Sequence, residues 1–311
     1  MSLNRSTYSY SRNYKPQILF GTQNYRIGNE LGSGCFSNVF FAQHNPTQTF
    51  VALKQIQLNG LDEKHFKCCI KEVELLNRVK SENVVKCYEW FFEESFLYIS
   101  LEFADKTDLE KRIKLMQKHG RLFSERTIWF LFHQICNGVK DLHSARILHR
   151  DLKPANIFLN SKGQIKIGDL GLSRLFSANT LIAKTQISTE YYKAPERTNT
   201  FYGYNFKSDI WSLGCLLYEL CALRSPFNGE QLNHFALYKK ICSAKFIPIP
   251  SQIYSDQLHF FIQNCMAVSS HDRPTADEAH FAARRMVFHF QTLTLKYDAA
   301  KMKLGAPSRS A

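Results

Sequence analysis

The chain has 311 residues, of which 44% are hydrophobic and 14% aromatic, and this composition excludes a mostly disordered protein because it can form a sizeable core. Its 40 basic and 27 acidic side chains give a formal net charge of +13, which predicts either an acidic partner or solvated basic tails. We favour basic tails, because the sequence has no recognisable nucleic-acid-binding module and no long basic helix face.

The cysteine distribution and the hydropathy of the chain predict where in the cell the protein is located. The nine cysteines are scattered without a C-x-x-C pair, and no histidines cluster at zinc-ligand spacing, which indicates reduced thiols. The N-terminus lacks the apolar core of a signal peptide, and no apolar run is long enough to span a bilayer. The sequence therefore predicts a soluble intracellular protein with no membrane partner and no specific nucleic-acid partner.

The first part of the chain alternates in hydropathy. Residues 1–24 are polar and basic and are predicted to form a disordered arm. From Tyr25 onward, alternating apolar residues and turn signals predict short strands. These strands are expected at Tyr25–Leu31, Asn38–Ala42, Phe50–Gln55, Val84–Phe91 and Phe96–Phe103. A helix is predicted between the third and fourth strands, over Lys64–Val79, from apolar residues at helical spacing.

Beyond Asp105 the periodicity is helical. Helices are predicted at Asp108–Lys118, Ser124–Ser144, Ser208–Leu223 and Asp256–Val268, with Ser124 as an N-cap. We therefore predict an α+β fold with two lobes. A small β-rich N-lobe covers about 25–101, and a larger helical C-lobe covers about 106–288, with a crease near Glu102–Asp105. Residues 289–311 are predicted to be a basic C-terminal tail.

A glycine-rich turn follows the first strand. Gly32, Ser33 and Gly34 allow the backbone to approach a triphosphate closely, so that its amides can donate to the phosphate oxygens. Ser37 occupies the third position of the G-x-G-x-x-G pattern, and a plain hairpin turn would explain the motif equally well. Lys54, on the third strand, is expected to pair with Glu72 of the following helix, because a buried lone ammonium is costly.

Two segments after the long helix carry separable chemical roles. The first is His149-Arg150-Asp151-Leu152-Lys153-Pro154-Ala155-Asn156, and the second is Ile165-Lys166-Ile167-Gly168-Asp169-Leu170-Gly171. Asp151 can accept the proton of an attacking hydroxyl, while Asn156 and Asp169 present oxygens to Mg²⁺. The order of these motifs in one chain predicts phosphoryl transfer.

At these residues the chain resembles the eukaryotic protein kinase superfamily over about Tyr25 to Phe288. The resemblance implies a two-lobed kinase domain over 25–288 that uses ATP and Mg²⁺ and acts on protein substrates. It implies that Lys153, Lys54 and Glu72 act with Asp151 in catalysis, and that Lys153 marks serine/threonine specificity. The implied ATP-binding residues are Leu31, Gly32, Ser33, Gly34, Val39, Ala52, Lys54, Leu101, Glu102, Ala104 and Phe158. For each apolar residue of this set, a place in the core is the alternative reading.

Further segments resemble other parts of a kinase. Ala194-Pro195-Glu196 is similar to the end of the activation segment, and Arg273 is similar to its ion-pair partner. Asp209 resembles the helical aspartate that steadies the catalytic loop. Glu125-Arg126-Thr127-Ile128-Trp129 and Gly168-Asp169-Leu170-Gly171-Leu172 resemble the NIMA-related kinases, especially the short branch with little beyond a catalytic domain.

This narrower resemblance carries regulatory expectations. It implies that Thr185 is phosphorylated in the active state by an upstream kinase of the same family, and that Arg150 and Arg174 bind the phosphate. Ser177, Thr180 and Ser188 are competing acceptors. The implied setting is cell-division or microtubule-linked signalling in the cytoplasm, with the cytoskeleton, centrosome or nucleus as further locations. The alternatives are a pseudokinase-like scaffold with little phosphotransfer and a basic adaptor.

Overall fold

The chain forms two compact units in the computed structural model, which describes residues 21–34, 37–59, 63–169, 190–198, 204–228 and 234–305. The first unit comprises the chain up to Phe66 together with Cys87–Phe103, and the second comprises Lys67–Lys86 together with the chain from Ala104 onward. The second unit thus includes residues 67–86, which the sequence analysis had placed in the N-lobe.

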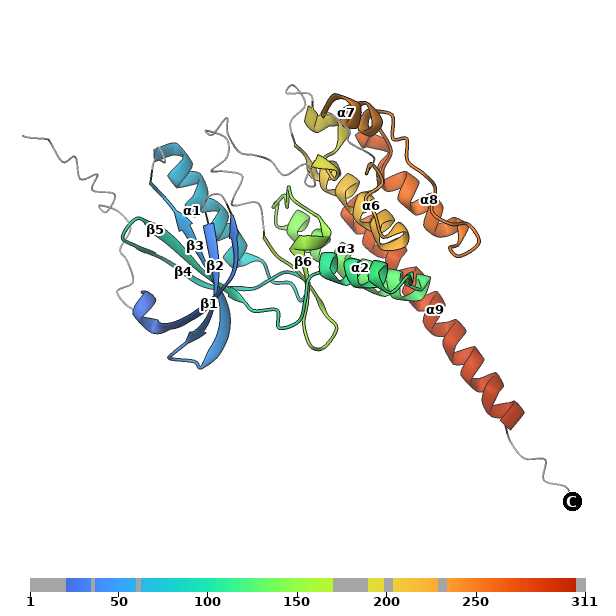
Figure 1. Ribbon diagram of the computed structural model, residues 1–311, viewed down its shortest axis with the longest axis horizontal. Coiled ribbons are helices and arrows are strands. Elements are labelled where there is room, and N and C mark those ends of the chain that lie inside the picture. The colour runs from blue at the N-terminus through green and yellow to red at the C-terminus, as the bar shows by residue number, and fades with distance from the viewer. Residues whose placement is uncertain are drawn as a thin grey trace, which may run out of the picture. The chain divides into compact units, whose positions relative to one another are not determined.

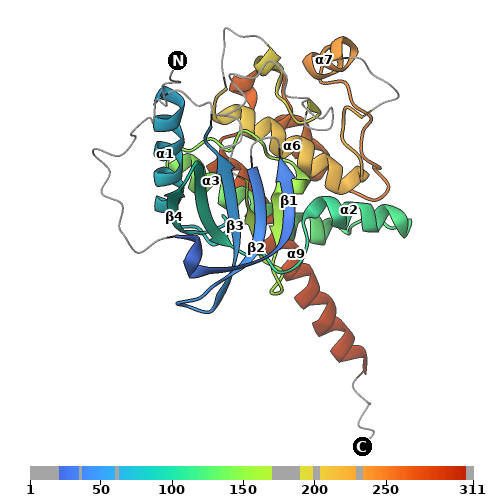
Figure 2. The same cartoon turned by 60° about the vertical axis from the view of Figure 1, so that its left-hand side comes forward.

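Five antiparallel strands make the sheet of the first unit (Figures 1 and 2). In spatial order they are β1 (Tyr25–Gly34), β2 (Ser37–His44), β3 (Thr49–Gln57), β5 (Phe96–Glu102) and β4 (Cys87–Glu93). All five were predicted, but the predicted start of β4 at Val84 was wrong. Val84 forms a parallel bridge with Ile167 of the second unit instead, so the strand begins three residues later.

Alternation along β3 separates a core face from a second face. Val51 and Leu53 are buried in a cluster with Tyr25, Ala42, Phe91 and Tyr98. Ala52 and Lys54 alternate with them along the strand and therefore point to the opposite face of the sheet. This arrangement explains why an apolar strand carries one lysine near its centre.

The N-terminal arm meets this unit in a short ordered turn. Thr22–Asn24 form a 3₁₀ turn, and the Thr22 amide donates to Glu93 at 3.1 Å. The predicted disordered arm covers residues 1–24, and the prediction is wrong for Thr22–Asn24; residues 1–20 lie outside the described part of the chain.

Helices dominate the second unit. They are α1 (Glu63–Arg78, which starts in the first unit), α2 (Leu109–Lys118), α3 (Glu125–Ser144), α6 (Phe206–Ala222), α7 (His234–Cys242), α8 (Asp256–Cys265) and α9 (Ala276–Gly305). A small hairpin of β6 (Ile157–Leu159) and β7 (Ile165–Ile167) lies among them. The part of the chain that the structure describes contains no helix long and apolar enough to cross a membrane.

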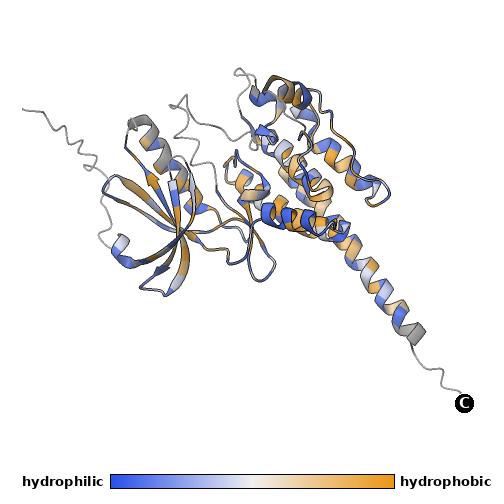
Figure 3. Ribbon diagram, viewed as in Figure 1, coloured by the Kyte–Doolittle hydropathy of each residue, from blue (hydrophilic) through white to orange (hydrophobic). Residues whose placement is uncertain are grey.

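Polar caps start these helices; the cap at Ser124 was predicted, whereas α6 begins two residues before the predicted start at Ser208. The Ser124 hydroxyl accepts from the Thr127 amide at the start of α3, and the Asp108 carboxylate accepts from Lys111 at the start of α2. α6 begins with a capping box between Asn205 and Ser208. Most of its residues are buried in the second unit, and α6 is accordingly hydrophobic around much of its surface, as Figure 3 shows.

The last helix continues beyond the predicted end of the domain. α9 packs against α3 and then runs through residue 288 as far as Gly305. Phe288 and Tyr297 are exposed on this segment, which extends away from the other helices of the second unit in Figures 1 and 2. Most of the predicted basic tail is therefore helical.

Candidate active site

The loop between α3 and β6 holds the proposed base in a defined position. The Asn156 amide donates from Nδ2 to the Asp151 carbonyl at 2.8 Å and to Asp151 Oδ2 at 3.0 Å. The Lys153 ammonium lies 3.0 Å from the same Oδ2. Three residues predicted for one site therefore meet at one carboxylate, which is oriented by a neutral donor and a cation.

A buried carboxylate beneath the loop fixes its backbone. Asp209, at the start of α6, accepts from the amides of His149 at 2.9 Å and Arg150 at 3.0 Å. Arg150 has a positive φ of 67°, a conformation that costs energy for a side chain of this size. The two amide bonds to Asp209 stabilise that turn and so place Asp151, the next residue.

Asp209 stays ionised despite its complete burial. Burial opposes its charge, but hydrogen bonds from His143 Nε2, at 2.9 Å, and from the Tyr204 hydroxyl keep its pKa below its usual value. The ion is therefore compensated by four donors from three segments of the second unit.

His149 links the same loop to the segment that is predicted to bind Mg²⁺. Its Nδ1 accepts from the Asp151 amide at 3.2 Å, so Nε2 is the protonated nitrogen that donates to the Gly168 carbonyl at 2.9 Å. Burial lowers the pKa of His149, which agrees with this neutral tautomer. Gly168 is required by the fold, because a Cβ there would lie 2.6 Å from the Phe158 ring.

The residues predicted to hold Mg²⁺ come from neighbouring segments. The Gly168 amide donates to the Asn156 carbonyl at 3.0 Å, so Asp169 directly follows a residue bonded to Asn156. Asn156 uses its side-chain nitrogen for both bonds to Asp151. Its side-chain oxygen, which is a hard ligand, is therefore the atom that would bind Mg²⁺. Carboxylate and amide oxygens fit Mg²⁺, which commonly keeps waters and phosphates as its other ligands. The described residues contain no cluster of three or more acidic, histidine or cysteine ligands.

The first unit brings together most of the predicted ATP-binding residues. Val39 lies opposite Lys54 on adjacent strands, and Ala52 lies opposite Leu101. Because Ala52 and Lys54 are two residues apart, all four side chains share the face turned away from the core cluster. Lys54 is only 4% exposed.

The glycine-rich segment ends β1 and pairs with β2. Gly32 and Gly34 have ordinary backbone angles, and a Cβ at Gly32 would meet nothing within 4 Å. The packing of the sheet therefore does not require glycine at position 32, and the phosphate-binding role of this segment stays a prediction. Ser33, on β1, pairs with Asn38 of β2. Leu31 also lies on β1 and is exposed, and Glu102 is the last residue of β5.

The remaining predicted residues lie elsewhere or cannot be placed. Phe158, on β6, and Ala104 belong to the second unit. Glu72 lies on α1, but its side chain is outside the described part of the structure, so its pairing with Lys54 stays a prediction. Thr185 and Arg174, with the competing acceptors, also lie outside the described residues.

The predicted pair at the end of the activation segment is present. Arg273 donates from Nη1 and Nη2 to the two carboxylate oxygens of Glu196, at 2.8 Å each. Its Nε donates to the Ala267 carbonyl at 2.8 Å, and its guanidinium lies 5.0 Å from the Trp211 ring centroid. The pair joins residues 77 positions apart in the chain.

Sequence reasoning missed several supporting residues. His143 and Tyr204 complete the shell of Asp209, and the buried Asn83 bonds to Ile165, Gln134 and Asn137. Asn83 and Val85 also exchange backbone bonds with Ile167 at 2.8 Å, which places residues 67–86 with the second unit. The sequence gives little signal for Asn83, because Lys80, Ser81 and Glu82 precede it and only Val84 and Val85 follow it before the next lysine. Its need for partners follows from its burial in the structure.

Comparison with known proteins agrees with this geometry. The protein kinase domain family matches residues 25–282. Serine/threonine-protein kinase Nek3 of Mus musculus is 41% identical over 254 residues, which are 81% of this chain and 48% of that protein. Nek5 of Homo sapiens is 40% identical, covering 81% of this chain and 35% of its own length, and Nek2 of Homo sapiens is 34% identical, covering 82% and 58%.

The chain thus spans about half or less of the first two relatives. Its assignment to a short branch with little beyond a catalytic domain stays a prediction, because these relatives are longer proteins. The family match, the sheet of the first unit and the loop around Asp151 support one another. The chain belongs to the protein kinase family, with its two-lobed fold, and within it to the NIMA-related serine/threonine kinases.

Proposed function

We propose that the chain is an ATP-dependent serine/threonine protein kinase that transfers the γ-phosphate of MgATP to proteins. The observation that carries the proposal is the Asp151 carboxylate, held by the Asn156 amide at 3.0 Å and the Lys153 ammonium at 3.0 Å. The relatives support this activity, because Nek3 and Nek5 are named serine/threonine-protein kinases.

The proposed reaction transfers a phosphoryl group from ATP to a hydroxyl of the protein substrate. The substrate hydroxyl oxygen bonds to the γ-phosphorus, the bond from that phosphorus to the bridging oxygen breaks, and ADP leaves with the bonding electron pair. Asp151 orients the hydroxyl and accepts its proton. Lys153 offsets negative charge beside Asp151, and Asn156 and Asp169 would hold Mg²⁺, which neutralises charge on the phosphates.

Regulation and location belong to the same proposal. Phosphate on Thr185 would be bound by Arg150 and Arg174, and an upstream kinase of the same family would add it. Arg150 is suited to this role because its backbone is held by Asp209. We place the protein in cell-division or microtubule-linked signalling in the cytoplasm, with cytoskeletal, centrosomal or nuclear pools.

The chief alternative is a scaffold with little phosphotransfer, and one experiment separates the two. The full chain and its Asp151→Asn variant are incubated with MgATP and a peptide library, and products are identified by mass spectrometry. We expect phosphoserine and phosphothreonine products from the wild type and a decrease of about 100-fold or more in the variant, the usual reach of a general base.

Nucleotide affinity is measured on both proteins by calorimetry. It should stay close to the wild-type value in Asp151→Asn, because Asp151 acts on the acceptor hydroxyl. Equal, near-zero turnover of both proteins would establish the scaffold.

A further inference from the structure

Two pockets adjoin each other in the second unit, on the segment that joins α7 to α8. The apolar pocket, of about 460 Å³, is lined by Phe246, Pro248, Ile249, Ile262, Met266 and Val268. The cationic pocket, of about 430 Å³, is lined by Arg224, Lys240, Lys245, Pro226 and Ile247. Both volumes are in the range of about 300–1,000 Å³ that is usual for ligand sites.

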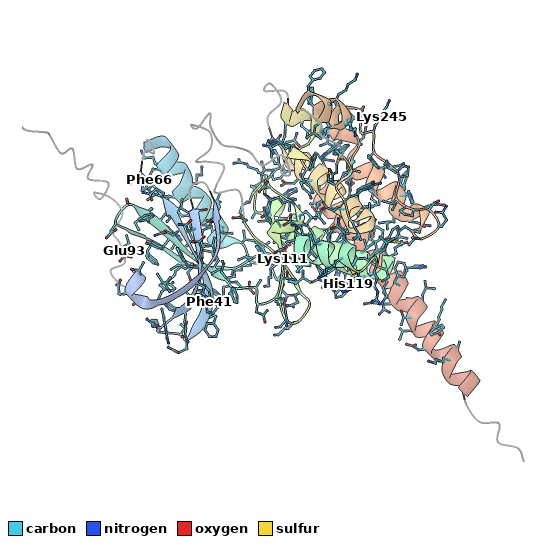
Figure 4. The ribbon with its side chains drawn as sticks, in the orientation of Figure 1. Phe41, Phe66, Glu93, Lys111, His119 and Lys245 are labelled. Atoms are coloured by element: carbon cyan, nitrogen blue, oxygen red, sulfur yellow. The ribbon has the colours of Figure 1, made fainter. Side chains whose placement is uncertain are left out.

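The two pockets are parts of one groove. They share Tyr218, Lys245, Phe246 and Pro248 as lining residues, so a ligand that fills one reaches the edge of the other. Figure 4 labels Lys245, which lies in the segment after α7. None of the residues assigned above to ATP, Mg²⁺ or phosphotransfer lines either pocket.

Hydrogen bonds hold the shared wall in place. The Tyr218 hydroxyl of α6 donates to the Ile247 carbonyl at 2.7 Å. His259 of α8 contacts the Ile249 carbonyl through Nε2, also at 2.7 Å. The segment that carries Ile247 and Ile249 is irregular, but these bonds attach it to α6 and α8. The groove is therefore largely formed before a ligand binds, which reduces the entropy lost on binding.

The charges of the groove define its ligand. Three cations line the cationic pocket, and among residues 204–228 and 234–305 no acidic side chain lines either pocket. Apolar side chains remain open to solvent beside them, since Ile247 is 62% exposed and Val268 47% exposed. A positive patch next to an apolar cavity complements a chain segment that carries carboxylates next to an apolar side chain.

We propose that this groove is a docking site for an acidic peptide segment of a partner protein. An apolar side chain of that segment enters the apolar pocket, and its carboxylates contact Arg224, Lys240 and Lys245. A nucleic acid would use the cations but has no aliphatic side chain for the apolar pocket, so the combination favours a peptide. The site goes beyond the proposed phosphotransfer and does not depend on Asp151.

Binding of synthetic peptides tests this proposal directly. A set of fluorescein-labelled peptides, each with one leucine and a glutamate pair separated by different numbers of serines, is titrated with the full chain and followed by fluorescence anisotropy. We expect saturable binding by some members of the set, no binding when serine replaces the leucine or the glutamates, and weaker binding at higher salt.

Variants locate the site. Lys245→Glu reverses an exposed charge shared by both pockets and should weaken binding by about fivefold or more. Val268→Asp places a charge in the apolar pocket and should weaken it at least as much. Lys162→Glu, an exposed lysine in the turn between β6 and β7, is the matched control and should bind as the wild type does.

The outcomes are separable from those of the kinase assay. Lys245→Glu should phosphorylate a short peptide without the leucine and glutamates at the wild-type rate, and an inactive wild type that still binds the set would refute only the kinase. The docking proposal is overturned if Lys245→Glu binds like the wild type or if no peptide binds. It is also overturned if only phosphoserine peptides or an oligonucleotide occupy the groove.

Discussion

Arg273 and Glu196 form a bidentate ion pair, with both nitrogen–oxygen distances at 2.8 Å, although 77 positions separate them in the chain. Arg273 is 1% exposed. Burial opposes the charge of Glu196, but hydrogen bonds from Arg273 and Ser208 keep its pKa below its usual value. The pair therefore connects the end of the activation segment to the segment that precedes α9.

Removal of Arg273 should destabilise the protein strongly. Arg273→Ala leaves the Glu196 carboxylate without its cation, and such changes typically cost about 3–5 kcal/mol of unfolding free energy. Denaturant unfolding followed by circular dichroism measures the loss. Arg285→Ala, at an exposed position of α9, should change stability by less than about 0.5 kcal/mol. A similar, small effect of both substitutions would contradict the structural role of the pair.

Lys54 should be needed for phosphotransfer rather than for folding. Lys54→Met keeps a long side chain on β3 and removes a buried ammonium, so the sheet should retain its packing. We expect kinase activity to fall by about 100-fold or more, because the cation can no longer position the phosphates. A kinase assay and a thermal melt are run beside Lys162→Met, at an exposed position, which should keep full activity. A well-folded Lys54→Met protein with full activity would disprove the assignment.

The carboxyl group of Glu219 should make stability depend on pH. Burial raises its pKa to about 7, although a hydrogen bond from Tyr192 opposes the shift. Between the unfolded value, near 4.5, and about 7 the folded state binds more protons than the unfolded chain does. The unfolding free energy should therefore fall as pH rises through this window and level off above it.

Glu219→Gln removes the titrating group and tests that dependence. The variant should show a flatter profile and greater stability than the wild type above pH 7, which denaturant unfolding at several pH values measures. Glu82→Gln, at an exposed position, is the control and should follow the wild-type profile. An unchanged slope in Glu219→Gln would show that another group is responsible.

Phosphorylation of Thr185 should activate the enzyme. Its phosphate would carry about −1.5 to −2 charge and three acceptor oxygens, which match the guanidinium groups of Arg150 and Arg174. Thr185→Ala should lower activity strongly, whereas Ser177→Ala should not. Phosphatase treatment should lower wild-type activity but have little effect on Arg150→Ala or Arg174→Ala. Equal activity of treated and untreated wild-type protein would exclude the mechanism.

Local sequence determined the secondary structure and the identity of the reacting groups. The apolar residues around Lys54 predicted a buried or paired lysine on β3, and Ser124 predicted the start of α3, because both depend on neighbours in the chain. Asp151 and Asn156 were predicted from the order of the motifs in the chain, and the structure joins them by hydrogen bonds that span five residues. The last helix was not predicted: α9 crosses residue 288, the predicted end of the domain, and continues to Gly305.

Tertiary structure decided what surrounds those groups. The pairing of Val84 with Ile167 set the start of β4, and Asp209, His143 and Tyr204 converge beneath the loop that carries Asp151. The docking groove likewise combines α6, α8 and the segment between α7 and α8. These features depend on contacts between residues far apart in sequence, and periodicity and propensity describe only a few neighbouring residues at a time.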